Sequence, residues 1–196
     1  MFDSIGSAPQ AVALTLYTDA FVIRGLLATR QRRITDMLNT AEDRFLVLSD
    51  VSSDEFGARG ESIRAEFAQV NLASVLFAVA DTSVDPAPEL RTPKIAEHAL
   101  ISVPPFKVIG RIHLLAERSL RDALGELTGH FVPVTDATFW SDTLGEARIS
   151  AALVAVNHER AQIMAPHQSV DPWAGLDRPA GASGPDGQPG TDDPGW

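Results

Sequence analysis

Apolar and polar residues alternate along several short stretches of the chain, which is the period of a half-buried β-strand. In 21–27 and 106–112 every second residue is apolar, apart from one glycine in each stretch. Two longer runs, 66–81 and 147–166, are rich in Val, Ala, Leu, Phe or Ile and predict strands that are bent or folded into hairpins. Asn157-His158 interrupts the second run and predicts a turn.

The two halves of the chain carry the same pattern. At an offset of 85, the first matching set pairs Phe21, Ile23, Gly25 and Leu27 with Phe106, Val108, Gly110 and Ile112. One inserted residue changes the offset to 86, which pairs Arg32, Ile34, Asp36, Leu38, Phe45, Leu48, Ser49, Asp50 and Ser52 with Arg118, Leu120, Asp122, Leu124, Phe131, Val134, Thr135, Asp136 and Thr138. Agreement in both residue type and spacing across a single gap predicts an internal duplication. The glycines, the aspartates and Phe45 with Phe131 define the repeat.

This repeat predicts the organisation of the chain. Residues 11–81 form a first β-rich repeat, 82–100 a proline-rich linker, 101–170 a second β-rich repeat, and 171–196 a tail. Each repeat is expected to run strand, loop, short helix, strand, and long strand or hairpin. The fold class is mainly β with short helices, a β-rich α+β protein. Two small antiparallel barrels or half-barrels would pack pseudo-symmetrically, or the copies would join into one continuous sheet.

Three segments between the periodic stretches predict irregular structure. Glycines and charges in SSDEFGARGES, 52–62, indicate an exposed loop in the first repeat. Within the linker, KIAEHAL at 94–100 favours one helical turn after the prolines. The tail, 171–196, holds five prolines and six glycines, so it cannot bury enough apolar surface to offset its ordering entropy and is expected to be disordered.

The charge of the chain disfavours polyanionic partners. The formal net charge is -10; the tail has five acids and one base, or -4, which leaves -6 for residues 1–170. An acidic body repels phosphate backbones and anionic lipid surfaces. We therefore expect no membrane partner and no general affinity for nucleic acid.

Composition also bears on location. The chain has no cysteine, which excludes disulfides and thiolate metal sites and fits a reducing compartment. No basic residue precedes Arg24, so the N-terminal stretch lacks the charge pattern of a secretory signal. No apolar stretch reaches the length of a transmembrane helix. A cytoplasmic location is the expectation.

Arginines offer one candidate ligand site. Asp36 and Asp122 each lie four residues after an arginine on a short predicted helix, which indicates an exposed ion pair. The alternative is that the arginines of both copies grip a phosphate or carboxylate. The candidate anion-binding residues are Arg30, Arg32, Arg33 and Arg118.

Other polar residues suggest structural roles. Asp50 and Asp136 follow strands and are expected to cap turns; a paired acid-base or metal site is the alternative. His113 alternates with apolar neighbours and should face solvent, while His158 and His167 flank the last strand and would be the only candidates to share a zinc ion. Because no catalytic or phosphate-binding motif is present, we expect no enzyme activity, no metal and no cofactor.

The second copy resembles the small barrels of the Sm-like superfamily, and the repeat is similar to units in bacterial proteins. The resemblance rests on the strand with Val108, Gly110 and Ile112, on FVPVTDATF (131–139), and on the closing segment VAVNHERAQIMAP (154–166). It implies a small β-barrel and, in many relatives, uridine binding. Here Asn157, His158 and Glu159 stand at the turn where relatives carry an arginine-glycine pair, which argues against that binding role.

These observations predict a non-enzymatic module for protein–protein interaction or assembly, with a scaffold or regulatory role. Its partner would be another protein or a second copy of the chain. The strands in 66–80 and 147–164 would supply the interface, because long apolar strands seek pairing. The alternatives are a sensor of a small anionic ligand or nucleotide and an Sm-like RNA-binding protein.

Overall fold

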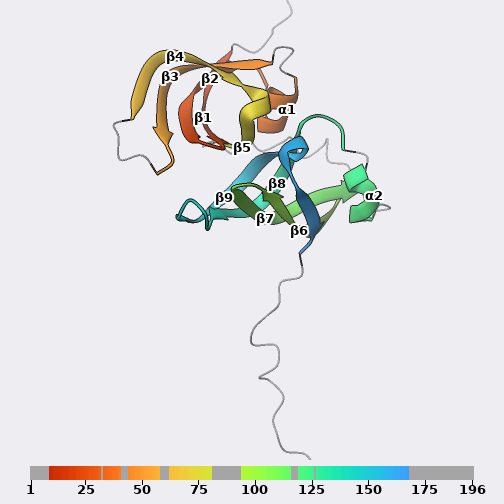
Figure 1. Cartoon of the computed structure of the whole chain (residues 1–196). Helices are drawn as coiled ribbons and strands as arrows, with labels where there is room; N and C mark the ends of the chain where they lie inside the picture. Colours follow the sequence, from red (N-terminus) through yellow and green to blue (C-terminus); the bar gives the residue numbers. More distant parts are fainter. Residues whose placement is uncertain are drawn as a thin grey trace, which may run out of the picture.

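The computed structural model describes residues 9–31, 33–40, 44–57, 62–80, 94–115, 119–125 and 127–167. In these ranges ten strands form one antiparallel sheet in the order β10-β6-β7-β8-β9-β5-β1-β2-β3-β4 (Figure 1). The strands are β1 (Gln10–Thr18), β2 (Phe21–Thr29), β3 (Phe45–Glu55), β4 (Ile63–Asn71), β5 (Val75–Ala80), β6 (Lys94–Val103), β7 (Phe106–Leu115), β8 (Phe131–Ser141), β9 (Glu146–Asn157) and β10 (Ile163–Pro166). The helical elements are α1 (Ile34–Asn39), α2 (Leu120–Gly125) and the 3₁₀ turns η1 (Leu72–Ser74) and η3 (His158–Arg160).

The strands of each half are neighbours in the sheet. The first half contributes β5-β1-β2-β3-β4 and the second contributes β10-β6-β7-β8-β9. In both halves the elements follow one another as two strands, a helix, two strands, a 3₁₀ turn and a last strand. The halves meet where β5 pairs with β9, with Phe77 opposite Val156. The sheet is therefore continuous and open, and β4 and β10 are its two ends.

Each half bends its sheet at a glycine that faces a β-bulge. Gly25 on β2 lies opposite two residues of β3, because the register passes from Arg24↔Ser52 to Leu26↔Ser49. A bulge of this kind bends and twists the strand that carries it. A Cβ on Gly25 would lie 3.0 Å from the Cβ of Leu48, a tight contact, so the close approach of the two backbones favours glycine.

The second half repeats this arrangement with tighter contacts. Gly110 on β7 faces two residues of β8, where the register passes from Ile109↔Thr138 to Arg111↔Thr135. A Cβ there would come within 2.5 Å of Val134 Cγ1 and 2.9 Å of the Thr135 carbonyl oxygen. The bend therefore leaves no room for any side chain at this position.

The core consists of two apolar clusters, and each includes residues from both halves. The first-half cluster contains Leu14, Leu16 and Leu48 together with Phe131 and Ala155 of the second half. The second-half cluster, which holds Phe106, Val108, Phe139, Val154 and Val156, also takes in Tyr17, Val22, Leu76 and Phe77 of the first. Burial of one such aromatic side chain stabilises the fold by roughly 1.5–3 kcal/mol. The halves are thus joined by shared packing as well as by hydrogen bonds.

Several expectations about the irregular segments are corrected. KIAEHAL does not form a helical turn: residues 94–100 belong to β6, which pairs with β7 from Lys94↔Leu115 to Val103↔Phe106. Pairing along the full strand overrides the weak local preference for helix. The loop expected at 52–62 begins later, because residues 52–55 continue β3; the linker before Lys94 and the tail lie outside the described residues.

The two long apolar runs are strands, as predicted, and each is broken by a 3₁₀ turn. The turn expected at Asn157-His158 is confirmed, since η3 begins at His158. Neither run is a hairpin, because β4 is not a neighbour of β5 in the sheet, nor β9 of β10. None of the helices in the described ranges has the length and hydropathy needed to cross a membrane.

Gly110→Ala should destabilise the fold by about 1–3 kcal/mol, because its new methyl group meets backbone atoms that cannot move away. Gly25→Ala should have a smaller effect, since its tightest contacts, 3.0 Å to Leu48 Cβ and 3.1 Å to the Ser49 carbonyl oxygen, are longer than the 2.5 and 2.9 Å at Gly110. Gly125→Ala is the matched control, because a Cβ there meets nothing within 4 Å. The free energy of unfolding in urea measures all three. Equal values for Gly110→Ala and Gly125→Ala would contradict the role assigned to the bulge.

Candidate functional site

The described structure includes two of the four candidate anion-binding arginines, Arg30 and Arg33. Arg32 and Arg118 lie outside the described residues. Arg30 and Arg33 are exposed, and neither lines the recess beside β4 or the pockets that contain Asp50 and Asp136. The structure therefore assigns no ligand geometry to this cluster.

The aspartates of the two short helices differ in their contacts. Asp36 is exposed at the start of α1. Before α2, the Ser119 hydroxyl donates to Asp122 Oδ2 at 2.7 Å, and the Asp122 backbone N–H donates to Ser119 Oγ at 3.2 Å. This reciprocal arrangement caps the start of a helix. Asp122 thus has a local structural partner.

Asp50 and Asp136 do not end strands or cap turns, contrary to the expectation. Both lie inside strands, at the bulges opposite the two glycines, with φ of 50° and 48°. Aspartate tolerates this left-handed conformation better than most residues, which explains why it stands at both bulges. Both side chains are exposed; Asp136 forms an ion pair with Arg111 at 3.1 Å. They line separate pockets.

The histidines are mostly surface residues with single polar partners. His113 is exposed, as predicted, and lies 2.7 Å from Thr135 Oγ1. His158 Nε2 lies 2.7 Å from the Gly129 carbonyl oxygen. Throughout the described ranges, no group of three or more His, Asp and Glu residues is placed to hold a metal ion.

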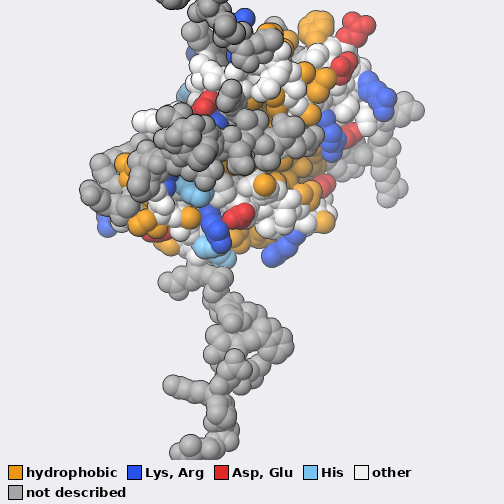
Figure 2. Space-filling view, turned by 180° about the vertical axis from the view of Figure 1, so that it is seen from behind, with side chains coloured by type: hydrophobic (Ala, Val, Ile, Leu, Met, Phe, Trp, Pro, Cys, Tyr) orange, Lys and Arg blue, Asp and Glu red, His pale blue; other side chains and the backbone are white. Residues whose placement is uncertain are grey.

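The open ends of the sheet carry unusual exposed apolar side chains. On β4, Ile63 and Phe67 are 64% and 66% exposed, and on β10 Ile163 is 57% exposed. Seen from behind, hydrophobic side chains gather over part of the described surface, with acidic and basic side chains beside them (Figure 2). Isolated apolar residues are common on protein surfaces, but apolar residues on an unpaired strand edge invite pairing with another strand.

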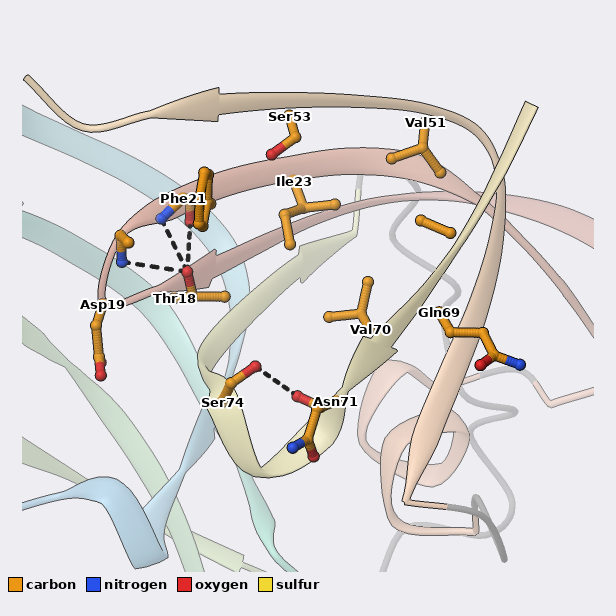
Figure 3. Close-up of a pocket in the computed structure, with 12 residues that line it drawn as sticks. Thr18, Asp19, Phe21, Ile23, Val51, Ser53, Gln69, Val70, Asn71 and Ser74 are labelled. Atoms are coloured by element: carbon orange, nitrogen blue, oxygen red, sulfur yellow. Dashed lines mark hydrogen bonds between the residues drawn. The ribbon is translucent and has the colours of Figure 1, made fainter. Parts of the chain in front are cut away.

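A pocket of about 430 Å³ lies beside the β4 edge. Its apolar lining comes from three strands, with Ile23 on β2, Val51 on β3 and Val70 on β4. The side chains of Ile23 and Val70 point toward one another across the opening (Figure 3). At its rim, Thr18 Oγ1 accepts the Phe21 backbone N–H at 2.8 Å and holds the β1–β2 turn closed. The pocket is thus an apolar recess with a fixed rim.

The corresponding place in the second half is filled. The offsets of the repeat carry Phe21, Ile23, Ser53, Ala68 and Val70 of the pocket to Phe106, Val108, Phe139, Val154 and Val156. Those five residues pack around Phe77, whose ring centroid lies 5.2 Å from that of Phe106 and 4.9 Å from that of Phe139. Phe77 comes from β5, the strand that pairs with β9. In the second half, then, β5 pairs with the edge of β9, and its Phe77 fills the place that is a recess in the first half.

Polar contacts fasten this junction. Asn157 Nδ2 donates to the Val75 carbonyl oxygen at 3.0 Å, and Asn157 is only 3% exposed. The Arg160 guanidinium contacts both carboxylate oxygens of Asp19, at 2.8 and 2.9 Å. Both contacts come from one guanidinium nitrogen, Nη2, and the pair lies on the surface. The 3₁₀ turn of the second half is thereby tied to the first hairpin.

A second polar contact joins α1 to the second half. Asn39 Nδ2 donates to the Phe131 carbonyl oxygen at 2.9 Å, and the Phe131 backbone N–H donates to Asn39 Oδ1 at 2.8 Å. At the start of β8, the backbone N–H and the carbonyl oxygen of Phe131 are therefore both hydrogen-bonded to the Asn39 side chain.

Sequence reasoning found the strands of this junction but missed its polar residues. One signal was available: Asn157 lies 86 residues after Asn71, and each side chain accepts a backbone N–H two residues later, from Glu159 and Ala73. Extending the repeat past residue 52 would have identified this pair. Nothing in the repeat points to Asn39 or Arg160, because their counterparts are Gly125 and Ser74.

Comparison of the chain with models of protein families, with curated proteins and with solved structures finds no match.

Tyr17 should make the stability of the junction fall in alkaline solution. Its ring stacks on Phe77 at 4.4 Å between centroids, and burial raises the pKa of its phenol above the usual 10.0. The folded state therefore keeps a proton that the unfolded chain loses, so the contribution of Tyr17 to stability is full below pH 10.0 and falls as pH rises through the folded-state pKa.

The chain has one tyrosine, so its near-ultraviolet phenolate absorbance reports this pKa directly. The titration midpoint should lie above 10.0 in the folded chain and return to about 10 in urea. Urea unfolding of the native chain and of Tyr17→Phe at neutral and alkaline pH should show a stability difference that changes only above pH 10.0. A folded-state midpoint at or below the unfolded value would contradict the burial assigned to this ring.

Proposed function

We propose that this protein is a non-enzymatic assembly module, which binds another polypeptide by adding a strand to the open ends of its sheet. Within this proposal the halves are two copies of one β-rich unit of half-barrel form, similar to Sm-like units, and the protein acts in the cytoplasm. The nucleic-acid and anion-sensing alternatives remain weaker, because Arg30 and Arg33 do not line the recess beside β4 or the pockets of Asp50 and Asp136.

Several paired features support the duplication. The order of elements and the order of strands are the same in both halves. Gly25 and Gly110 face bulges that place Asp50 and Asp136 at positive φ. A descent from one unit accounts for such detail better than independent origins, because a bulge with a matching glycine is a specific local solution.

Strand addition is the mode of binding that the sheet favours. An edge strand presents unpaired backbone N–H and C=O groups, and pairing with a second strand satisfies them while side-chain recesses give specificity. The β4 edge combines such groups with the recess lined by Ile23, Val51 and Val70. Proteins commonly protect their edges with charges or proline; β10 ends at Pro166, but Phe67 and Ile163 remain exposed.

The single observation that carries the proposal is the difference between two equivalent edges. β9 is covered by β5 along Phe77↔Val156, Ala78↔Ala155 and Val79↔Val154, and Phe77 fills the recess beside it. Among the described residues, β4 is the end strand of the sheet, and no strand fills the recess beside it. The β9 edge thus has a partner strand within the chain, and we propose that another polypeptide supplies the partner strand for the β4 edge.

The native mass of the tagged full chain tests this function in extracts of the cells that produce it, after nuclease treatment. We expect a complex heavier than the 21.0 kDa monomer. Phe67→Lys, which places a charge on an exposed edge position, should reduce the complex at least tenfold. Ile149→Lys, a similar change at an exposed position on an inner strand, should retain it.

A chain that runs as a monomer in such extracts, unchanged by Phe67→Lys, would contradict the proposal. An absorbance ratio raised toward 260 nm in the purified complex, persisting in high salt without nuclease, would instead favour the RNA-binding alternative.

A further inference from the structure

We propose that the partner at β4 is β10 of a second copy of this chain, with Ile163 seated in the recess beside β4. This inference rests on the proposed function and names its partner. Its template is the junction between β5 and β9, because β5 and β10 are the last strands of the two halves, and β4 and β9 are the strands before them.

Applying the offset of 86 residues to the pairs of the internal junction predicts which residues of β4 and β10 would lie opposite one another between copies. Phe77, Ala78 and Val79 of β5 correspond to Ile163, Met164 and Ala165 of β10, and Val156, Ala155 and Val154 of β9 correspond to Val70, Gln69 and Ala68 of β4. The expected antiparallel pairs between copies are therefore Ile163↔Val70, Met164↔Gln69 and Ala165↔Ala68.

Burial differs between equivalent positions in the way this contact requires. Phe77 is fully buried at the junction, whereas its counterpart Ile163 is 57% exposed. Phe131 is 2% exposed beneath the first half, whereas its counterpart Phe45 is 48% exposed. Both differences arise because no strand in the described ranges covers the equivalent surface. A second copy would cover Ile163 and the β4 side of the first half together.

The polar anchor of the junction has a counterpart at β4. Asn157 is buried and donates to the carbonyl of Val75, whereas Asn71 is exposed. Val75 corresponds to Ala161. In the assembled state Asn71 Nδ2 would donate to the Ala161 carbonyl oxygen of the second copy, while its Oδ1 keeps the bond from Ala73 that it already accepts.

Other contacts of the internal junction have no counterpart between copies, and this determines how strongly the copies are expected to bind. Ser74 and Pro104 stand where Arg160 and Asp19 form their ion pair, and Gly125 replaces Asn39. Ile163 is also smaller than Phe77. The contact between copies should therefore be weaker than the contact within the chain, so assembly should depend on protein concentration.

The contact is head-to-tail, because it joins two different surfaces. Each copy would offer β4 to one neighbour and β10 to the other, so a chain of copies either closes into a ring or extends as a filament. A ring gives one discrete mass at high concentration, and a filament gives a broad distribution; both would agree with the proposal.

Engineered cysteines can test the register, because the natural chain has none. Gln69→Cys and Met164→Cys are single variants of the full chain, and the opposed positions of antiparallel strands lie within disulfide range. Mixed under mild oxidation, the two should form a cross-linked dimer at least tenfold faster than either variant alone. The mixture of Gln69→Cys with Ile163→Cys is the control, because neighbouring residues on β10 point to opposite faces.

A mixture of Gln69→Cys and Met164→Cys that cross-links no faster than the single variants would overturn the register. So would faster cross-linking in the control mixture. Both β-strand positions are partly or fully exposed in the single chain, so the substitutions should leave its fold intact.

Light scattering of the purified full chain over a range of concentrations tests the partner itself. The average mass should rise above 21.0 kDa, and Ile163→Asp should keep the chain monomeric. Ile149→Asp should assemble like the natural chain, because it is an exposed isoleucine away from the β4 and β10 edges. Circular dichroism should show that both variants remain folded.

The two proposals can fail separately. A purified chain that is monomeric at every concentration, with no cross-linking, would overturn self-assembly; if its extract complex persists and depends on Phe67, the proposed function stands with a different protein as partner. Monomers in both experiments would overturn both proposals.

Discussion

The close approach of two backbones at a glycine is the constraint on which the rest of the structure depends. Without a bulge opposite Gly25 and Gly110, five adjacent strands would form a twisted sheet that is less sharply bent, and its apolar face would enclose less of a core of its own. The bend lets a short chain segment enclose the side chains of its own strands. It also turns the outer strand of each half toward the place where a further strand can be added.

This geometry explains why neighbouring halves share their cores. A half of roughly 70 residues has little interior volume, and bending five strands leaves one side of that interior uncovered. Phe77 covers this side of the second half, and its strand, β5, pairs with β9 and so joins the two halves of the sheet. The Arg160–Asp19 ion pair and the two bonds from Asn39 then fix the angle between the halves, which apolar packing alone would leave adjustable. Directional contacts therefore define a junction whose energy is mostly apolar.

Much of the fold could be predicted from the sequence, because periodicity and repetition are local signals. The alternation in 21–27 and 106–112 identified β2 and β7, and the matched spacing located both helices and the turn at His158. The strand at 94–103 was missed because its pairing with β7 is a tertiary effect. The strand before Asp50 was expected to end there because aspartate is common in turns, whereas β3 continues to Glu55. The recess beside β4 could not be predicted, because it depends on how three strands pack and on the absence of a covering side chain, and neither is a local signal in the sequence.

Shared cores have a consequence for how the molecule comes apart. Removing the second half would strip Phe77 and Tyr17 of the rings of Phe106 and Phe139, and removing the first would leave Phe131 and Ala155 without their cover. Neither half can therefore melt while the other keeps its interior intact, so heat or denaturant should dismantle the described sheet in a single cooperative transition. Thermodynamically the two halves should behave as one domain, although their shared sequence pattern divides the chain in two.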